Sequence, residues 1–259
     1  MILRRLGNKK KIAKEIQKYF PPHKIYIEPF FGAGGMFFNK PKAKYNIVND
    51  LDSDVFNLFN VVMNQKEELE KAFYMMPIHS DLLKHWKENE ETEPIKKALR
   101  FLFLSNWTIL GTGNGLYFGG SRVQGKKNFI PLIESTFEKL FDVQFNNQDC
   151  NKFLVNNNLD NRGNKKESDN TLIYCDPPYL GTNDNYSNSF TEEQSKELFD
   201  TLEETGCKFA MSEFDHPFIL EQAKQRNLNI IIIGERQNLK NRRTEILVTN
   251  YSNSQQSLF

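Results

Sequence analysis

Short apolar runs alternate with amphipathic stretches along most of the chain, a pattern typical of an α/β protein. The apolar runs predict strands over residues 24–30, 45–49, 143–147, 171–175, 208–212, 229–234 and 245–251. The amphipathic stretches predict helices over residues 9–20, 52–64, 67–74, 80–89, 93–107, 192–205 and 217–226. The sequence therefore predicts a sheet covered by helices.

The alternation stops between the second and third predicted strands. Helix follows helix from residue 67 to 107, and the glycines that come next, at 111, 113, 115, 119 and 120, indicate the turns of a hairpin or loop. We interpret residues 66–133 as an insertion. The sheet domain is then formed by residues 1–65 and 134–251, and residues 252–259 form a flexible tail.

The last two predicted strands are joined by residues 235–243, which are too few for a helical crossover. We therefore expect these strands to pair antiparallel at one edge of an otherwise parallel sheet. The predicted fold class is α/β: a Rossmann-like mixed sheet with an antiparallel edge hairpin, plus a mainly helical insertion that carries a hairpin loop.

Composition excludes several classes of protein. With 259 residues, 39% of them hydrophobic, the chain suits one large α/β domain or a domain with an insertion. No run approaches the roughly 18 apolar residues of a membrane span, and the start lacks the apolar core of a secretory signal, so we expect a cytoplasmic protein. The spacing of its three cysteines and four histidines predicts neither a disulfide nor a metal site.

Basic residues are unevenly distributed, although the net charge is only +1. One cluster crowds the N-terminus, and another, Arg122, Lys126 and Lys127, lies in a predicted Gly-rich loop. Such clusters are either solvated loops or parts of one surface for a phosphate backbone, depending on whether the fold brings them together.

The strongest candidate for chemistry is the tetrapeptide Asp176, Pro177, Pro178 and Tyr179, which follows the apolar run at 171–175. The prolines fix their own φ and bias the preceding residues toward extended geometry, so the Asp176 carboxylate and the Tyr179 ring are rigidly held. A carboxylate, a carbonyl and a ring in this order suit gripping the amino group and face of a nucleobase. The alternative is a Pro-Pro turn that closes the strand.

A glycine-rich turn follows the first predicted strand. It runs from Glu28 through Phe30, Gly32 and Gly34, and its spacing is not that of a dinucleotide or phosphate-binding loop. Asp50 ends the second strand, where an acidic residue suits both hydroxyls of a ribose. A nucleoside without phosphates, such as S-adenosylmethionine, fits this pair, whereas close packing of strand and helix explains the glycines alone.

These motifs and their order resemble the Dam-like (D12 class) DNA adenine-N6 methyltransferases over nearly the whole chain. The family carries a Phe-x-Gly-x-Gly donor motif and an Asp-Pro-Pro-Tyr motif with a target-recognition region between them, and the insertion at 66–133 agrees with that order. The resemblance implies the fold of the methyltransferases that use S-adenosylmethionine. It also implies double-stranded DNA as substrate and a prokaryotic or phage origin.

The resemblance also assigns residues to the donor and to DNA. Gly7, Asn8 and Lys9 are similar to the family's N-terminal donor-binding element, Asp50 matches its ribose-binding acid, and Asp149 is similar in position to the residue that meets the donor's adenine. In the predicted hairpin, Asn114, Tyr117 and Arg122 are candidate base readers, beside Lys126 and Lys127. The arginine of the family's Asn-Gly-Leu-x-Arg pattern is absent there, so the resemblance does not extend to recognition of GATC.

The predicted reaction is transfer of a methyl group to the N6 amino group of a flipped adenine. Asp176 and the Pro177 carbonyl would hold the amino group, and Tyr179 would stack on the ring, with no metal involved. Alternatives are a cytosine-N4 or RNA methyltransferase, since a base amino group is held similarly in each. A catalytically inactive nucleic-acid-binding relative is a third.

The end of the sequence holds a separate signal. Residues Gln255 to Phe259 read Gln-Gln-Ser-Leu-Phe, which resembles the short motif by which bacterial proteins dock on the replication sliding clamp. The alternative is an uninformative polar tail, because five-residue matches arise readily by chance.

Overall fold

A seven-stranded sheet forms the centre of the protein. The computed structural model describes residues 1–259 except 4, 6, 110, 112, 117–124, 158–164, 182–189, 238–241 and 253–259. The strands of the sheet are β1 (Ile25–Glu28), β2 (Tyr45–Asn49), β5 (Val143–Asn146), β6 (Thr171–Cys175), β7 (Lys208–Phe214), β8 (Asn229–Gln237) and β9 (Arg242–Thr249). Their order is β5-β2-β1-β6-β7-β9-β8.

The predicted mixed sheet is confirmed. Neighbouring strands from β5 to β7 are parallel, whereas β9 pairs antiparallel with both β7 and β8. From β1 the chain first builds outward through β2 to β5 and later returns to add β6 on the other side. The order of strands therefore reverses between β1 and β6, and ligands of open α/β sheets bind at the carboxyl ends of strands beside such a reversal.

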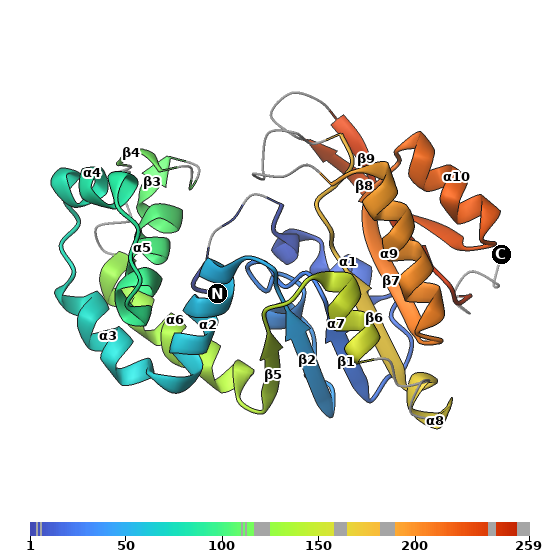
Figure 1. The fold of residues 1–259 in the computed structure, drawn as a ribbon, viewed down its shortest axis with the longest axis horizontal. Coiled ribbons are helices and arrows are strands. Elements are labelled where there is room, and N and C mark those ends of the chain that lie inside the picture. The colour runs from blue at the N-terminus through green and yellow to red at the C-terminus, as the bar shows by residue number, and fades with distance from the viewer. Residues whose placement is uncertain are drawn as a thin grey trace.

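Both faces of the sheet are buried. In β6, Leu172 and Tyr174 belong to one hydrophobic cluster, while Ile173 and Cys175 point to the other face and belong to a second. Helices α7 (Cys150–Asn156), α9 (Glu192–Glu204) and α10 (Pro217–Gln225) cover the second face, as Figure 1 shows for α7 and α9 in front of the sheet. The N-terminal segment, α1 (Ala13–Gln17) and α2 (Ser53–Asn64) contribute to the first cluster.

Several predicted helices have different bounds. The helix predicted over 9–20 is a 3-10 turn, η1 (Lys9–Lys11), followed by the short α1. Asn8 caps the turn by accepting from the Lys10 N–H, and Lys9 within it is buried. Helices α7 and α8 (Lys165–Ser168) were not predicted, and a further 3-10 turn, η2 (Phe37–Asn39), follows the glycine loop. The prediction of a Gly-rich loop around Lys126 and Lys127 is wrong, because both residues lie in α6 (Gly125–Leu140).

The predicted insertion packs around its own aromatic side chains. It contains α3 (Lys66–Met75), α4 (Ser80–Glu88), α5 (Pro94–Trp107), the hairpin strands β3 (Thr108–Ile109) and β4 (Asn114–Leu116), and the first part of α6. The rings of Phe73 and Phe129 stack at 4.6 Å, beside Trp107. Figure 1 shows these elements beside the β5 edge of the sheet. Helix α6 continues past the predicted boundary at Ile133 and leads into β5.

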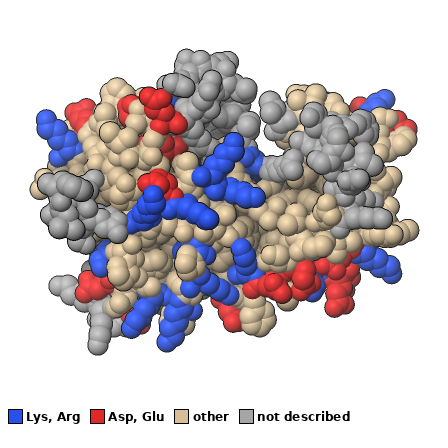
Figure 2. Space-filling view, turned by 180° about the vertical axis from the view of Figure 1, so that it is seen from behind, with Lys and Arg blue, Asp and Glu red and all other residues tan. Residues whose placement is uncertain are grey.

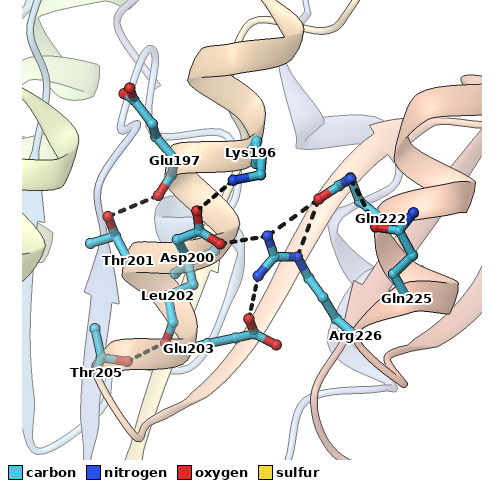
Figure 3. Close-up of polar contacts among 10 residues, drawn as sticks. All are labelled: Lys196, Glu197, Asp200, Thr201, Leu202, Glu203, Thr205, Gln222, Gln225 and Arg226. Atoms are coloured by element: carbon cyan, nitrogen blue, oxygen red, sulfur yellow. Dashed lines mark hydrogen bonds and ion pairs between the residues drawn. The ribbon is translucent and has the colours of Figure 1, made fainter.

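An ion-pair network joins α9 to the end of α10 on the second face. Arg226 contacts Asp200 at 2.5 Å, and it also pairs with Glu203 and donates to the side-chain oxygen of Gln222 (Figure 3). Its guanidinium lies 5.6 Å from the centroid of the Phe199 ring. This network holds the two helices together away from the carboxyl ends of the parallel strands.

Within the described part of the chain, no helix is long and apolar enough to cross a membrane.

Candidate active site

The glycine loop after β1 is tied to the end of β2 by Asp50. The backbone N–H of Gly32 donates to Asp50 Oδ2 at 2.6 Å, and the N–H of Asp52 donates to Oδ1 at 2.9 Å. Gly32 has a φ of +53°, and the position of a Cβ on it is open space within 4 Å. The sharp turn therefore needs glycine and leaves room beside the backbone.

Asn49 joins this loop to the end of the third parallel strand, β5. Its side-chain amide donates to the carbonyls of Pro29 and Gln148, both at 3.0 Å, and its oxygen accepts from the Gln148 N–H. Asp149 follows and caps α7 through Oδ1, which accepts from the N–H groups of Asn151 and Lys152. The carboxyl ends of β1, β2 and β5 are thus fixed relative to one another.

Gly34 and Gly35 have different roles in the loop. A Cβ on Gly34 would lie 2.3 Å from the Phe38 ring, so this glycine is needed for close packing beneath the loop. A Cβ on Gly35 would lie 2.3 Å from Asn8 Oδ1 and 2.7 Å from the Lys9 backbone nitrogen. Gly35 therefore lets the N-terminal segment lie directly against the glycine loop.

Asp176 follows β6 and faces the N-terminal segment. The buried Lys9 ammonium donates to Asp176 Oδ1 at 2.6 Å. Tyr179 is buried, its hydroxyl donates to Glu245 Oε1 at 2.5 Å, and its ring meets Phe214 edge-on with centroids 4.7 Å apart. The tetrapeptide is thus fixed from two directions, by the N-terminal segment and by β9.

Burial raises the pKa of three carboxyl groups near the tetrapeptide and the glycine loop, which favours their neutral forms. It raises the pKa of Glu28 to about 8, against a hydrogen bond from the Tyr26 hydroxyl. It also raises the pKa of Glu213 to about 8, although the N–H groups of Leu180 and Phe214 both donate to that carboxyl. Burial likewise raises the pKa of Asp50, against the two backbone N–H groups that favour its ionised form.

The N-terminal segment, the glycine loop, the ends of β2 and β5 and the tetrapeptide all line one cavity. Its volume of about 580 Å³ is typical of small-molecule sites. Of the predicted catalytic residues, Asp176 and Pro178 line it, whereas Pro177 and Tyr179 do not. All predicted donor residues except Gly34 line the wall: Gly7, Asn8, Lys9, Glu28, Phe30, Gly32, Asp50 and Asp149. Sequence reasoning missed other wall residues, including Arg5, Leu51, Asp52, Cys150 and Phe190.

Two of the missed residues belong to one ion pair. Arg5 donates to Asp52 Oδ2 at 2.8 Å, which joins the N-terminal segment to the residue two positions after Asp50. Asp52 also caps α2 through the N–H of Asp54. In the sequence, the only sign of Asp52 in the site is its position two residues after Asp50. Spacing alone does not distinguish a helix cap such as Asp52 from a ligand-binding acid, as predicted for Asp50.

Of the predicted DNA-reading residues, Asn114 is described with its side chain, and it does not line the cavity. Asn114 lies on β4, and its Oδ1 accepts from Lys87 Nζ of α4 at 3.5 Å. Tyr117 and Arg122 lie outside the described residues, as do the side chains of Lys126 and Lys127. Among the described residues, no group of three or more His, Cys, Asp or Glu side chains is placed to hold a metal ion.

The raised pKa of Glu28 predicts a stability that depends on pH. In the unfolded chain this carboxyl ionises near its ordinary pKa, whereas in the fold it stays neutral up to about 8. The fold therefore loses stability relative to the unfolded chain as pH rises between these two values. We expect the Glu28→Gln variant to match the wild type near about pH 4.5 and to exceed it by roughly 2 to 4 kcal/mol near about pH 8.5.

Chemical denaturation at both pH values measures this difference. Glu88→Gln, at an exposed position, removes the same formal charge and serves as the control. A stability difference between Glu28→Gln and the wild type that stays constant with pH would contradict the raised pKa.

Comparison with known proteins identifies the family. Residues 6–246 match the family described as D12 class N6 adenine-specific DNA methyltransferase. The DNA adenine methylase of Escherichia coli (strain K12) is 27% identical over 209 residues, covering 76% of this chain and 73% of that protein. The type II methyltransferase M1.LlaDCHI of Lactococcus lactis subsp. cremoris is 26% identical over 280 residues, covering 95% and 94%.

A solved structure, the rRNA methyltransferase AviRa from Streptomyces viridochromogenes, aligns with a TM-score of 0.38 and 11% identity over 92% of this chain and 84% of that one. The family match covers the N-terminal segment, the glycine loop, the insertion and the tetrapeptide, in the predicted order. Of the target classes weighed from the sequence, it favours adenine in DNA over cytosine-N4 and RNA. The chain belongs to the D12 class of N6 adenine-specific DNA methyltransferases.

Proposed function

We propose that the protein transfers the methyl group of S-adenosylmethionine to N6 of an adenine that is turned out of duplex DNA into the cavity beside Asp176. The observation that carries this proposal is that Gly32, Asp50 and Asp176, from the ends of three different strands, line one cavity. A donor and an acceptor base would therefore meet at the reversal of the strand order.

The cavity wall fits the proposed donor. Asp50 suits the two ribose hydroxyls, and the open space beside Gly32 lets a ligand approach the backbone. The donor's amino-acid end would lie against Gly7, Asn8 and Glu28, where side-chain and backbone oxygens can accept from its ammonium group. Asp149 would face the donor's adenine.

When bound, S-adenosylmethionine supplies a methyl group that its sulfonium already activates. The protein's part is then to hold the adenine amino nitrogen in line with it. Asp176 accepts a hydrogen bond from the amino group, and the Pro177 carbonyl accepts the second. Both acceptors stabilise the positive charge that develops on the nitrogen, and Tyr179 holds the ring.

The surface around the N-terminal segment suits a phosphate backbone. Lys10, Lys11, Lys14 and Lys18 are exposed along η1, α1 and the residue after it. Figure 2 shows Lys and Arg side chains across the middle of the face seen from behind, which carries α1. Contacts of this kind position DNA without reading its sequence. We assign the reading of the sequence to the hairpin with Asn114, and to Tyr117 and Arg122, which lie outside the described residues.

Methylation of DNA that lacks methyladenine tests the function. The protein is incubated with such DNA and labelled S-adenosylmethionine, and the product is sequenced with a readout for methyladenine. We expect label on adenine at one short recurring sequence, and calorimetry is expected to detect donor binding without DNA. Label on cytosine, transfer to RNA alone, or donor binding without transfer would each contradict the proposal.

The C-terminal tail adds a proposed partner. Residues Gln255 to Phe259 lie outside the described residues, so docking on a sliding clamp stays a prediction from their sequence. Deleting these five residues is expected to abolish retention by an immobilised bacterial clamp without changing methyl transfer to short duplexes. Retention that is absent in the full chain, or unchanged by the deletion, would contradict it.

A further inference from the structure

The Lys9 ammonium lies between two carboxylates. Its Nζ atom is 2.6 Å from Asp176 Oδ1 and 3.4 Å from Glu245 Oε1, and it also donates to the Gly7 carbonyl at 3.4 Å. Lys9 is only 2% exposed and Glu245 only 1%. A charge buried this deeply depends on such partners, because it has lost most of its contact with water.

Lys9 also contacts the two groups that would bind the adenine in the proposed function, the Asp176 carboxylate and the Tyr179 ring. Its ammonium lies 4.5 Å from the centroid of the Tyr179 ring, in a cation–π contact, while donating to Asp176. The adenine amino group would need the same carboxylate, and the base would need a face of the same ring. Without DNA, Lys9 therefore satisfies both groups, and an incoming base must compete with it.

Glu245 is the second acceptor for this ammonium. It lies on β9 opposite Phe214 of β7, and the Oε1 atom that accepts from the Tyr179 hydroxyl is the one nearest Lys9 Nζ. A shift of Nζ by about half an ångström would bring the pair into the usual range of hydrogen-bond distances. Glu245 can therefore accept a hydrogen bond from Lys9 while it still accepts one from the Tyr179 hydroxyl.

We propose that Glu245 is a positioning residue, which receives the Lys9 ammonium from Asp176 when the adenine amino group binds. This inference rests on the proposed function. The exchange keeps one carboxylate opposite Lys9 throughout and frees Asp176 to accept from the substrate. If Glu245 is made neutral, Asp176 becomes the sole carboxylate in contact with Lys9 among the described contacts, so Lys9 competes more strongly with the base.

Glu245→Gln tests the exchange, because glutamine keeps an acceptor for the Tyr179 hydroxyl and removes the charge. We expect single-turnover methyl transfer to fall by about tenfold to a hundredfold at saturating donor, with the dissociation constant for S-adenosylmethionine within about threefold of the wild type. Glu197→Gln is the control for loss of one carboxylate, since Glu197 is exposed on α9 and lies outside the cavity wall. An equal loss in that variant, or no loss in Glu245→Gln, would overturn the proposal.

A second variant separates the exchange from simple support of Tyr179. In a Lys9→Met background there is no ammonium to exchange, so Glu245→Gln is expected to change the residual rate by less than about twofold. The same loss in both backgrounds would mean that Glu245 acts through Tyr179 alone, which would overturn the exchange.

A crystal structure of the wild-type protein with DNA and an unreactive donor analogue gives a readout that does not depend on any variant's folding. Lys9 Nζ is expected at hydrogen-bond distance from Glu245, with the adenine amino group on Asp176. Lys9 still bound to Asp176 beside a bound base would overturn the inference. Wild-type protein that binds the donor and leaves no methyladenine would instead count against the proposed function itself.

Discussion

Replacing Asp176 by alanine is expected to lower methyl transfer to DNA by at least about a thousandfold while changing donor affinity by less than about threefold. Asp176 is the carboxylate that would accept from the adenine amino group, and it follows β6, whereas the glycine loop that would hold the donor follows β1. The two effects separate because Asp50 and Gly32 are tied to each other and not to Asp176.

Labelled methyl incorporation at saturating donor measures the first quantity, and calorimetry measures the second. Asp176→Asn is the matched variant, because it keeps the size and one acceptor oxygen but removes the charge, and an intermediate loss is expected. Lys9 retains Glu245 and the Gly7 carbonyl in both variants, so the site should stay folded. Full activity in Asp176→Ala would refute the catalytic assignment.

Gly35→Ala is expected to weaken donor binding by about thirtyfold to a hundredfold, the second-largest effect, because it would displace the N-terminal segment that lines the cavity. A Cβ at this position would overlap Asn8 Oδ1 at 2.3 Å and the Lys9 backbone nitrogen at 2.7 Å. The backbone nitrogen cannot rotate away, so residues 7–9 must shift. Asn8 would also lose its geometry as the cap of η1.

Calorimetric titration with S-adenosylmethionine measures this loss, and circular dichroism checks the fold. Gly234→Ala is the control, because a Cβ there meets nothing within 4 Å and the position lies on β8, although its φ of +151° is unusual for alanine. We expect this control to lose some stability and no donor affinity. If Gly35→Ala binds the donor as tightly as the control does, donor binding does not depend on close contact between the glycine loop and the N-terminal segment.

Local patterns in the sequence predicted the sheet well. The bounds of β2 and β6 agree with the prediction. In β6 every residue is buried, because a strand covered on both faces is largely apolar and ends where polar residues begin. Helix α6 was missed because glycine and lysine at its start are typical of loops, and Pro131 lies inside it. Its helical state depends on packing of Phe129 and Ile133 in the core, which is a tertiary effect.

The site was predicted where one motif carries it and missed where distant segments meet. Asp50 and Asp176 each follow a strand, so their position at one edge of the sheet follows from parallel pairing. Gly34 was predicted because it completes the Phe-x-Gly-x-Gly motif, whereas the role of Gly35 depends on its contact with Asn8 and Lys9. Glu245 fits an ordinary strand, and its role depends on Lys9 and Tyr179, which no spacing rule brings to it.

The span of the Lys9 contacts bears on the order of folding. Lys9 meets Asp176 across 167 positions, and the Tyr251 hydroxyl reaches the Tyr19 carbonyl across 232. Contacts between residues so far apart in sequence tend to form slowly, because a long loop must close before they form. A growing chain would thus hold the glycine loop and the tetrapeptide before β9 leaves the ribosome, and it would gain a complete site only with its last strand. Recovery of methyl transfer during refolding should therefore coincide with the pairing of β9 and lag behind recovery of helix content.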